Sequence, residues 1–243
     1  MNNYKIEITD TFGGEANYSW IRRYEIAANT FFATKKAALQ AVASLSNTSK
    51  MPGKSWGISA SLCHTGRKLA AIDGTVCSDC YACKGFYAMM PSVAQAHRAR
   101  IDAYTHDRLA WCQAMVDLIG SEKHFRWFDS GDIQSADMLR DILSIVARTP
   151  NTQHWIATRE VAYVREALQG KPLPDNVVIR MSAAFPDDTR VPGQSLTGNS
   201  ALVFTDKPQQ GAHVCPAPKQ GGACGACRAC WSRDVVTVTY KAH

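Results

Sequence analysis

The spacing of apolar residues predicts alternating strands and helices in the second half of the chain. Three apolar stretches rich in β-forming residues cover residues 125–132, 154–160 and 177–183. Between them lie two segments with helical spacing, SADMLRDILSIVART, with Ser135 at the N-cap position, and VAYVREALQG, which ends in glycine. Strands that alternate with helices predict an α/β fold with a parallel sheet and right-handed crossovers. A partial or complete (β/α) barrel suits the length.

The first fifty residues predict a small separate unit. The stretches YKIEIT and YSWIRRYEI predict two strands joined by the turn-rich FGGEAN, and TKKAALQAVASL predicts a helix. The serine, proline and glycine residues of SNTSKMPGKS mark a linker that ends near Lys54. We therefore expect a β-β-α appendage over residues 1–49 and a cysteine-rich domain over residues 50–243. Within that domain, residues 92–119 have helical spacing with a break near Thr105.

Composition narrows the class of protein. With 243 residues, 46% of them hydrophobic and 20% charged, the chain can bury one sizeable core. No apolar run approaches the roughly 18–20 residues of a bilayer span, and MNNYKIEITD has neither a basic start nor an apolar signal core. We expect a cytoplasmic protein that does not enter a membrane. Its net charge of +6 fits loose attraction to nucleic acid or phosphorylated ligands, but an ordinary solvated surface is the commoner explanation.

The nine cysteines are the most informative residues. An odd number excludes a complete disulfide framework, and clustered cysteines in a reducing compartment more often bind metal or do redox chemistry. Eight of them fall within residues 63–83 and 215–230. The exception, Cys112, lies on an apolar helical pattern and is expected to be a core thiol.

The first group consists of Cys63 and, after thirteen residues, Cys77, Cys80 and Cys83 at two-residue gaps. A Cys-x-x-Cys pair brings two sulfurs onto one metal or cluster, and a distant cysteine can close the face. This tandem spacing favours an iron-sulfur cluster over zinc. A structural zinc would take four of these thiolates, whereas three ligands and an open iron would mark a catalytic cluster.

The second group consists of Cys215, Cys224, Cys227 and Cys230. Its Cys-x-x-Cys-x-x-Cys run resembles part of the bacterial ferredoxin pattern, and the nearby glycines let the backbone donate N–H groups towards sulfur. Four thiolates complete either a cluster or a tetrahedral zinc site, so both remain open here.

Polar residues follow three successive predicted strands, where the mouth of a (β/α) barrel would lie. They are Asp129, Ser130 and Asp132, then Thr158, Arg159 and Glu160, then Arg180 and Ser182. Turn and capping roles explain such residues singly, but their coincidence at three strands favours a site. The candidates for catalysis or for positioning a small-molecule ligand are Asp129, Asp132, Arg159 and Glu160.

Several segments in fixed order resemble the phage protein family called gene product 88, over about residues 50–243. They are KMPGKSWGISASLCHTG, GTVCSDCYACKGFY, FRWFDSGDIQS, TPNTQHWIATRE and CPAPKQGGACGACRACW. The resemblance implies that the metal ligands are Cys63, Cys77, Cys80, Cys215, Cys224, Cys227 and Cys230. It leaves out Cys83, because relatives usually have another residue there.

The stretch CSDCYA also resembles the cluster loop of radical S-adenosylmethionine proteins, which implies a 4Fe-4S cluster on a (β/α) barrel. Their usual Cys-x-x-x-Cys-x-x-Cys loop and glycine-rich segment are absent in standard form. The leading hypothesis is a phage-encoded 4Fe-4S protein in the host cytoplasm. In this hypothesis the protein holds one cluster, and whether the C-terminal cysteines hold a second is left open. Redox or S-adenosylmethionine-dependent catalysis is left open as well.

The alternative hypotheses are not enzymatic. One is an electron carrier, and the other is a zinc-stabilised or cluster-stabilised module that binds nucleic acid or a host protein. In the second, phosphate contacts would come from basic residues near the first cysteine group, namely Lys54, Arg67, Lys68, Lys84, Arg98 and Arg100.

Overall fold

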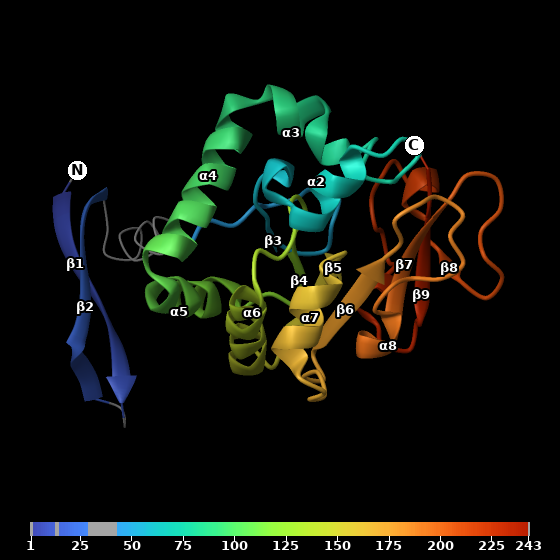
Figure 1. The fold of residues 1–243 in the computed structure, drawn as a ribbon. Coiled ribbons are helices and arrows are strands. Elements are labelled where there is room, and N and C mark those ends of the chain that lie inside the picture. The colour runs from blue at the N-terminus through green and yellow to red at the C-terminus, as the bar shows by residue number, and fades with distance from the viewer. Residues whose placement is uncertain (1, 13–14, 29–42, 243) are drawn as a thin grey trace.

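The computed structural model describes residues 2–12, 15–28 and 43–242. In this part of the chain, seven strands form one sheet in which every neighbouring pair is parallel. Their order is β3 (Ser55–Trp56), β4 (His124–Trp127), β5 (Gln153–Thr158), β6 (Val177–Ser182), β7 (Asn199–Phe204), β9 (Thr237–Lys241) and β8 (His213–Val214). The sheet runs from the centre of Figure 1 to its right-hand side.

The helices between these strands are short to medium in length. They are α2 (His64–Ala70), α3 (Gly85–Met89), α4 (Pro91–His106), α5 (Arg108–Ile119), α6 (Ala136–Arg148), α7 (Val161–Leu168) and α8 (Gln194–Thr197). Four 3-10 turns cover Ala60–Leu62, Tyr81–Cys83, Ala217–Lys219 and Ala229–Trp231 in the described residues. None of the described helices has the length and apolar character to span a membrane.

Side-chain caps mark the start of α5 and of α6. Ser135 caps α6, as its position predicts, by accepting a 3.0 Å hydrogen bond from the amide of Met138. The predicted break in the long helical segment lies at Asp107, whose carboxylate accepts from the amide of Ala110 and starts α5.

One face of the sheet packs against α5, α6 and α7. Alternate strand residues, among them Trp127, Ile156 and Ile179, lie in register and join the buried cluster that these helices complete. His154 belongs to this face: it accepts a 3.2 Å hydrogen bond from the Trp127 indole, and its other ring nitrogen lies 2.9 Å from the Thr149 hydroxyl.

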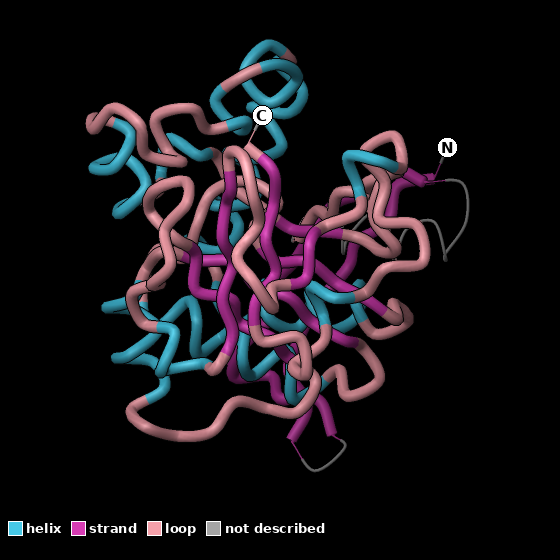
Figure 2. Tube along the Cα trace, turned by 90° about the vertical axis from the view of Figure 1, so that its right-hand side faces the viewer, coloured by secondary structure: helices cyan, strands magenta, loops and turns pink. Residues whose placement is uncertain are grey.

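The C-terminal segment covers the opposite face of β4 to β6. Trp231 packs edge-on against Trp155, with ring centroids 5.1 Å apart, and its indole donates to the carbonyl of Phe125. The in-register neighbours on this face include Arg126 beside Trp155 and Ala157 beside Arg180. Figure 2 shows the long loops around the C-terminal strands, seen from the side of β8. Both faces of β4 to β6 are therefore covered, as is usual for parallel sheets.

The three predicted strands and the helices between them are confirmed, whereas β3, β7, β8 and β9 were not predicted. The sheet confirms a mixed α/β fold with parallel strands, but its order ends at β3 and β8, so closure into a barrel stays a prediction. Both predicted N-terminal strands are present, as β1 (Asn2–Phe12) and β2 (Glu15–Ala28), and they pair antiparallel. The predicted helix over residues 34–45 lies mostly outside the described residues.

Candidate metal centre

The first cysteine loop lies over the carboxyl ends of the parallel strands, at the upper edge of the sheet in Figure 1. Glu160, just after β5, accepts 2.7 Å hydrogen bonds from both the amide and the hydroxyl of Thr65 in α2. The amide of Val76 donates to the carbonyl of Ala184, beyond β6. The strand ends thus fix both halves of this loop.

A third anchor comes from the end of β4. The Tyr81 hydroxyl, between Cys80 and Cys83, donates to the carbonyl of Asp129. Asp129 follows Phe128, whose φ of 56° lies in the left-handed region that bulky residues rarely adopt. This sharp turn directs the strand end towards the cysteine loop.

Two thiols of the loop lie close to Gly66. A side chain at Gly66 would meet the sulfurs of Cys63 and Cys77 at 3.6 and 3.7 Å, and the β-carbon of Cys63 at 3.0 Å. The two sulfurs are therefore no farther apart than the sum of the first two distances. Cys83 is exposed, whereas the other three cysteines are half-buried.

The electrostatic surroundings oppose bare thiolates. Burial raises the pKa of Cys63, and the nearby Asp132, Cys80 and Cys77 raise it further. Burial also raises the pKa of Cys77, although the Arg159 guanidinium opposes this shift. Thiolates are the form that binds metal, and positive charge placed near these thiols would favour that form.

The predicted strand-end residues lie beneath this loop. Asp132 is 6% exposed and accepts hydrogen bonds from the amides of Ile133 and Arg159 and from the hydroxyl of Thr158. Burial raises the pKa of Asp132 to about 6 despite these hydrogen bonds. Arg159 donates to the carbonyl of Ala183. These residues hold the strand ends and the loop in place.

Arg180 does not line the mouth, contrary to the prediction. It is fully buried, and its guanidinium fans out to carbonyl oxygens of the C-terminal segment and β7. The acceptors, at 2.7–3.3 Å, are those of Ser200, Ala229, Cys230, Ser232, Val235 and Val236. Arg180 lies on the face of β6 that the C-terminal segment covers, so its side chain contacts that segment and not the strand ends.

The second cysteine group lies in that segment. Cys215 is tied to β9 through the carbonyl of Thr239, and Cys224 to the carbonyl of Lys50, both at 2.9 Å. The sulfur of Cys230 lies 3.2 Å from the Tyr240 hydroxyl, and that of Cys227 lies 3.4 Å from a ring nitrogen of His213.

Burial affects the pKa of two thiols in the second group. Burial raises the pKa of Cys224, and Cys215 and Cys227 add to it. Burial raises the pKa of Cys230 to about 11, while Tyr240, Arg180 and Arg126 oppose that shift. Cys215 therefore acts on both Cys224 and Cys230, and Cys227 acts on Cys224.

Arg126 joins the two groups, and the sequence reasoning missed it. Its guanidinium lies 4.5 Å from the ring centre of Trp155 and donates a 3.3 Å hydrogen bond to Tyr81 in the first loop. It also lowers the pKa of Cys224 and Cys230 against the effect of burial. A lone arginine within the apolar stretch HFRWF was the available signal.

The ninth cysteine lies apart from both groups. Cys112 is a buried thiol in α5, as predicted. Within the described residues, no three His, Cys, Asp or Glu side chains converge closely enough to hold a single ion as they stand. The donor set of half-buried thiols nevertheless has the chemistry that clusters and zinc both use.

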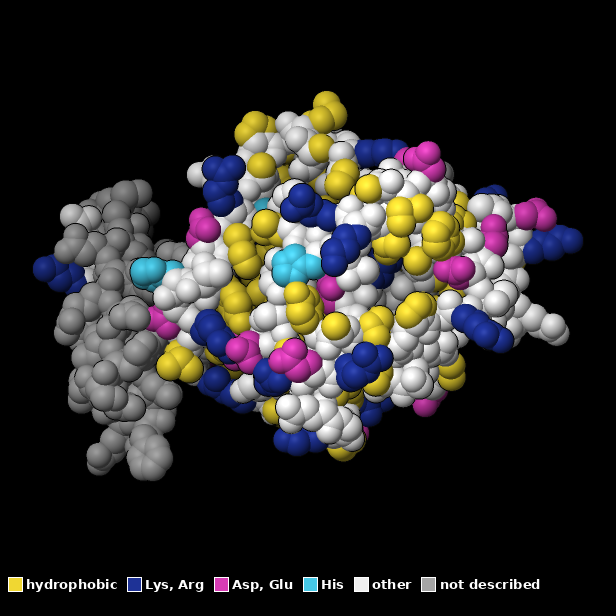
Figure 3. Space-filling model, in the orientation of Figure 1, with side chains coloured by type: hydrophobic (Ala, Val, Ile, Leu, Met, Phe, Trp, Pro, Cys, Tyr) yellow, Lys and Arg dark blue, Asp and Glu magenta, His cyan; other side chains and the backbone are white. Residues whose placement is uncertain are grey.

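The expected basic patch is smaller than predicted. Arg100 is buried and donates to Ser44, Ser46 and Gly57, so it cannot contact phosphate at the surface. Lys54 pairs with Glu122 and Lys84 with Asp79. Figure 3 shows Lys and Arg scattered among acidic and apolar side chains on the face that Figure 1 also presents.

A family model described as gene product 88 matches residues 25–233. The match begins within β2, earlier than the motifs that first suggested it. No match was found among curated proteins or among solved structures.

Proposed function

The chain belongs to the gene product 88 family, and from that premise and the grouping of its thiols we propose that it binds a 4Fe-4S cluster through Cys63, Cys77 and Cys80. The observation that carries this proposal is the loop itself. It carries three half-buried thiols over the ends of parallel strands, two of them, Cys63 and Cys77, close to Gly66, and Glu160 and Asp129 anchor it there.

Charge supports the proposal. Burial raises the pKa of Cys63 and Cys77, and two buried carboxylates beside them, Asp132 and Glu160, raise it further. Deprotonated ligands in such surroundings require strong positive charge nearby, and iron of a cluster supplies it. Gly66 supports it too, because a side chain there would crowd two of the three sulfurs.

The protein groups have distinct tasks in this proposal. Glu160 holds α2 and so fixes Cys63, while Arg159 offsets negative charge at Cys77. Asp132 fixes the backbone after β5, on which Glu160 depends. A cluster with one iron free of protein sulfur would supply one-electron chemistry and a position for a small chelating ligand such as S-adenosylmethionine.

The second group is proposed to hold a second metal centre, either a cluster or zinc, through Cys215, Cys224, Cys227 and Cys230. Its role is structural or electron-transferring. It lies on the covered face of the sheet, where Arg180 binds the backbone at Ala229 and Cys230.

Cys83 provides the test, because it is exposed and its replacement should not disturb the fold. We expect anaerobically purified Cys83→Ala to keep wild-type iron, and S-adenosylmethionine to change the electron paramagnetic resonance spectrum of the reduced cluster. Cys80→Ala is the matched variant and should lose iron.

The other outcomes are equally informative. If Cys83→Ala loses iron as Cys80→Ala does, the centre is fully cysteine-ligated and the catalytic form of the proposal fails. If iron stays and S-adenosylmethionine has no effect, a cluster that transfers electrons or stabilises the fold replaces the catalytic form.

A further inference from the structure

The two cysteine groups differ in the buried charges that lie beside them. Two buried carboxylates, Asp132 and Glu160, adjoin the first group. Glu160 binds Thr65, two residues after Cys63, and Asp132 accepts a hydrogen bond from the amide of Arg159. The Arg159 guanidinium offsets part of this negative charge. The first group therefore lies beside two carboxylates and one guanidinium.

The second group lies beside cations instead. Arg180 is fully buried and donates to the carbonyls of Ala229 and Cys230, at 2.7 and 3.2 Å. Arg228 is the next residue after Cys227 and donates to the carbonyl of that cysteine at 2.8 Å. Carbonyl oxygens are neutral, so these contacts leave the positive charge of both guanidinium groups in place.

Arg126 adds a third cation beside the second group. Its Nη1 lies 3.6 Å from the sulfur of Met51, which follows Lys50, and the carbonyl of Lys50 accepts from the amide of Cys224. Among the described residues, the Nε of Arg126 is buried without a hydrogen-bond partner. Burial raises the pKa of Cys224 and Cys230, and Arg126 opposes that rise at both thiols. The guanidinium is thus close enough to act on two of the four sulfurs.

Two side chains also lie within hydrogen-bond reach of sulfurs in the second group. The Tyr240 hydroxyl is 3.2 Å from the sulfur of Cys230, and a ring nitrogen of His213 is 3.4 Å from that of Cys227. Towards a thiolate, a hydroxyl or a ring N–H acts as a donor. Positive charge and hydrogen bonds to sulfur raise the reduction potential of an iron-sulfur centre, whereas nearby carboxylates lower it.

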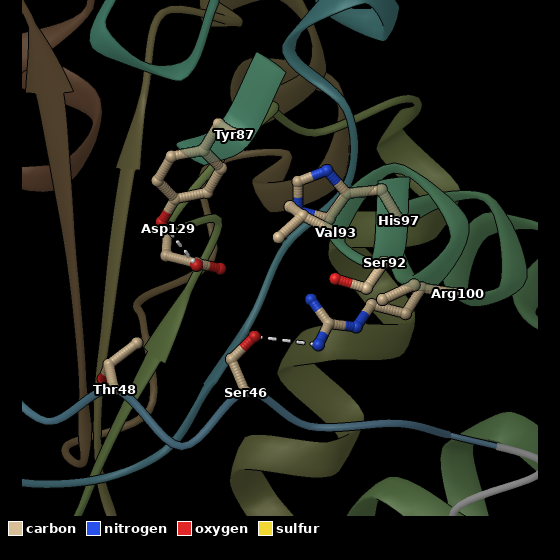
Figure 4. Close-up of a pocket in the computed structure, with 9 residues that line it drawn as sticks. Ser46, Thr48, Tyr87, Ser92, Val93, His97, Arg100 and Asp129 are labelled. Carbon is tan, nitrogen blue, oxygen red and sulfur yellow. Dashed lines mark hydrogen bonds between the residues drawn. The ribbon is translucent and has the colours of Figure 1, made fainter. Parts of the chain in front are cut away.

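The third strand-end carboxylate, Asp129, is held elsewhere. Figure 4 shows its side chain on the wall of a cavity of ≈ 280 Å³, where it accepts a 3.0 Å hydrogen bond from Tyr87. Its other oxygen is buried against the backbone of Gly57, where an added side chain would overlap it. Asp129 is therefore held by α3 and by the residue after β3, so Asp132 and Glu160 are the carboxylates that we place beside the first group.

We propose that these charges set the order in which the two centres are reduced, such that a cluster at the second cysteine group accepts an electron at a higher potential than the cluster at the first group. The inference rests on the proposed function and takes the second centre to be a cluster and not zinc. Each reduction takes one electron from an external one-electron donor, and no bond forms or breaks. The first centre is then the stronger reductant, and an electron that reaches the protein settles on the second.

An anaerobic redox titration of the full chain with dithionite, followed by electron paramagnetic resonance, tests this order. A variant with Cys63, Cys77 and Cys80 replaced by alanine keeps the signal of the second centre and so identifies it. We expect that signal to appear at the higher potential in wild type.

Arg126→Met should lower the reduced-to-oxidised ratio of the second centre about tenfold at a fixed potential, which is about 59 mV for one electron. The potential of the first centre should not move. Arg126→Lys keeps the charge and should restore most of the wild-type potential. Arg140→Met removes a surface arginine, so it is the matched control and should shift neither centre.

A second variant keeps the test decisive if Arg126→Met does not fold. Asp132→Asn keeps the shape of the side chain and removes its charge, so it should raise the potential of the first centre by a similar factor and leave the second unchanged. The inference is overturned if the first centre is reduced at an equal or higher potential, if neither charge variant shifts its centre, or if the second group holds zinc. The cluster at the first group survives each of these results. If the alanine variant keeps both signals, or wild type contains no sulfide, the proposed function fails and the inference falls with it.

Discussion

Replacing Arg180 should release the C-terminal cysteine segment from the sheet. Arg180→Met keeps much of the side-chain volume but removes every guanidinium donor, and leaves the carbonyls around it without partners in a fully buried place. One unsatisfied buried acceptor costs about 1–3 kcal/mol. Since several acceptors lose their partner together and some will relax, we expect a loss of about 3–5 kcal/mol in the free energy of unfolding.

Urea unfolding measures this loss, and tryptophan fluorescence is a suitable signal because Trp231 and Trp155 pack beside the segment. Arg140→Met is the matched control. Arg140, on α6, forms surface ion pairs with Asp137 of the same helix and with Glu166 of α7. Such pairs contribute about 0–1 kcal/mol to stability. If Arg180→Met unfolds within about 1 kcal/mol of wild type, the account of how β6 holds the second cysteine group is wrong.

Three further predictions concern pH, the core thiol and the loop anchor. Burial lowers the pKa of His154 to about 4 from its usual 6.5, so the unfolded chain binds more protons as pH falls. The free energy of unfolding therefore does not depend on His154 above pH 6.5, and it falls by up to about 1.4 kcal/mol per pH unit between pH 6.5 and pH 4. In urea unfolding, His154→Gln should lack this pH dependence. Equal pH profiles for the variant and wild type would contradict the prediction. Cys112→Ser should keep wild-type iron, whereas Cys77→Ser should lose it, as measured by iron content; equal iron loss would disprove the core-thiol assignment. Glu160→Gln, which weakens the contact with Thr65, should lower iron occupancy of the first group, and unchanged iron would show that the anchor is dispensable.

Three of the seven strands in the described sheet could be predicted, because β4, β5 and β6 are apolar and the segments between them have helical spacing. The short strands could not: β3 and β8 have two residues each, too few for a period to appear. The two-residue gaps place Cys77, Cys80 and Cys83 within one loop, but which thiols share a metal centre stays a prediction.

The environment of Arg126 and Arg180 could not be predicted. A charged residue in an apolar strand signals something unusual, but only the tertiary structure shows that a segment some fifty residues later covers it. The same limit applies to Arg100, because its contacts with Ser44 and Ser46 join segments more than fifty residues apart.

The central claim is the 4Fe-4S cluster at the first cysteine group. The most direct measurement is the amount of iron, acid-labile sulfide and zinc per chain in protein purified without oxygen, for wild type and for a variant with Cys63, Cys77 and Cys80 replaced by alanine. The account predicts that the triple variant loses about four iron and four sulfide per chain relative to wild type. Stoichiometric zinc without sulfide in wild type, or equal iron and sulfide in both proteins, would contradict it.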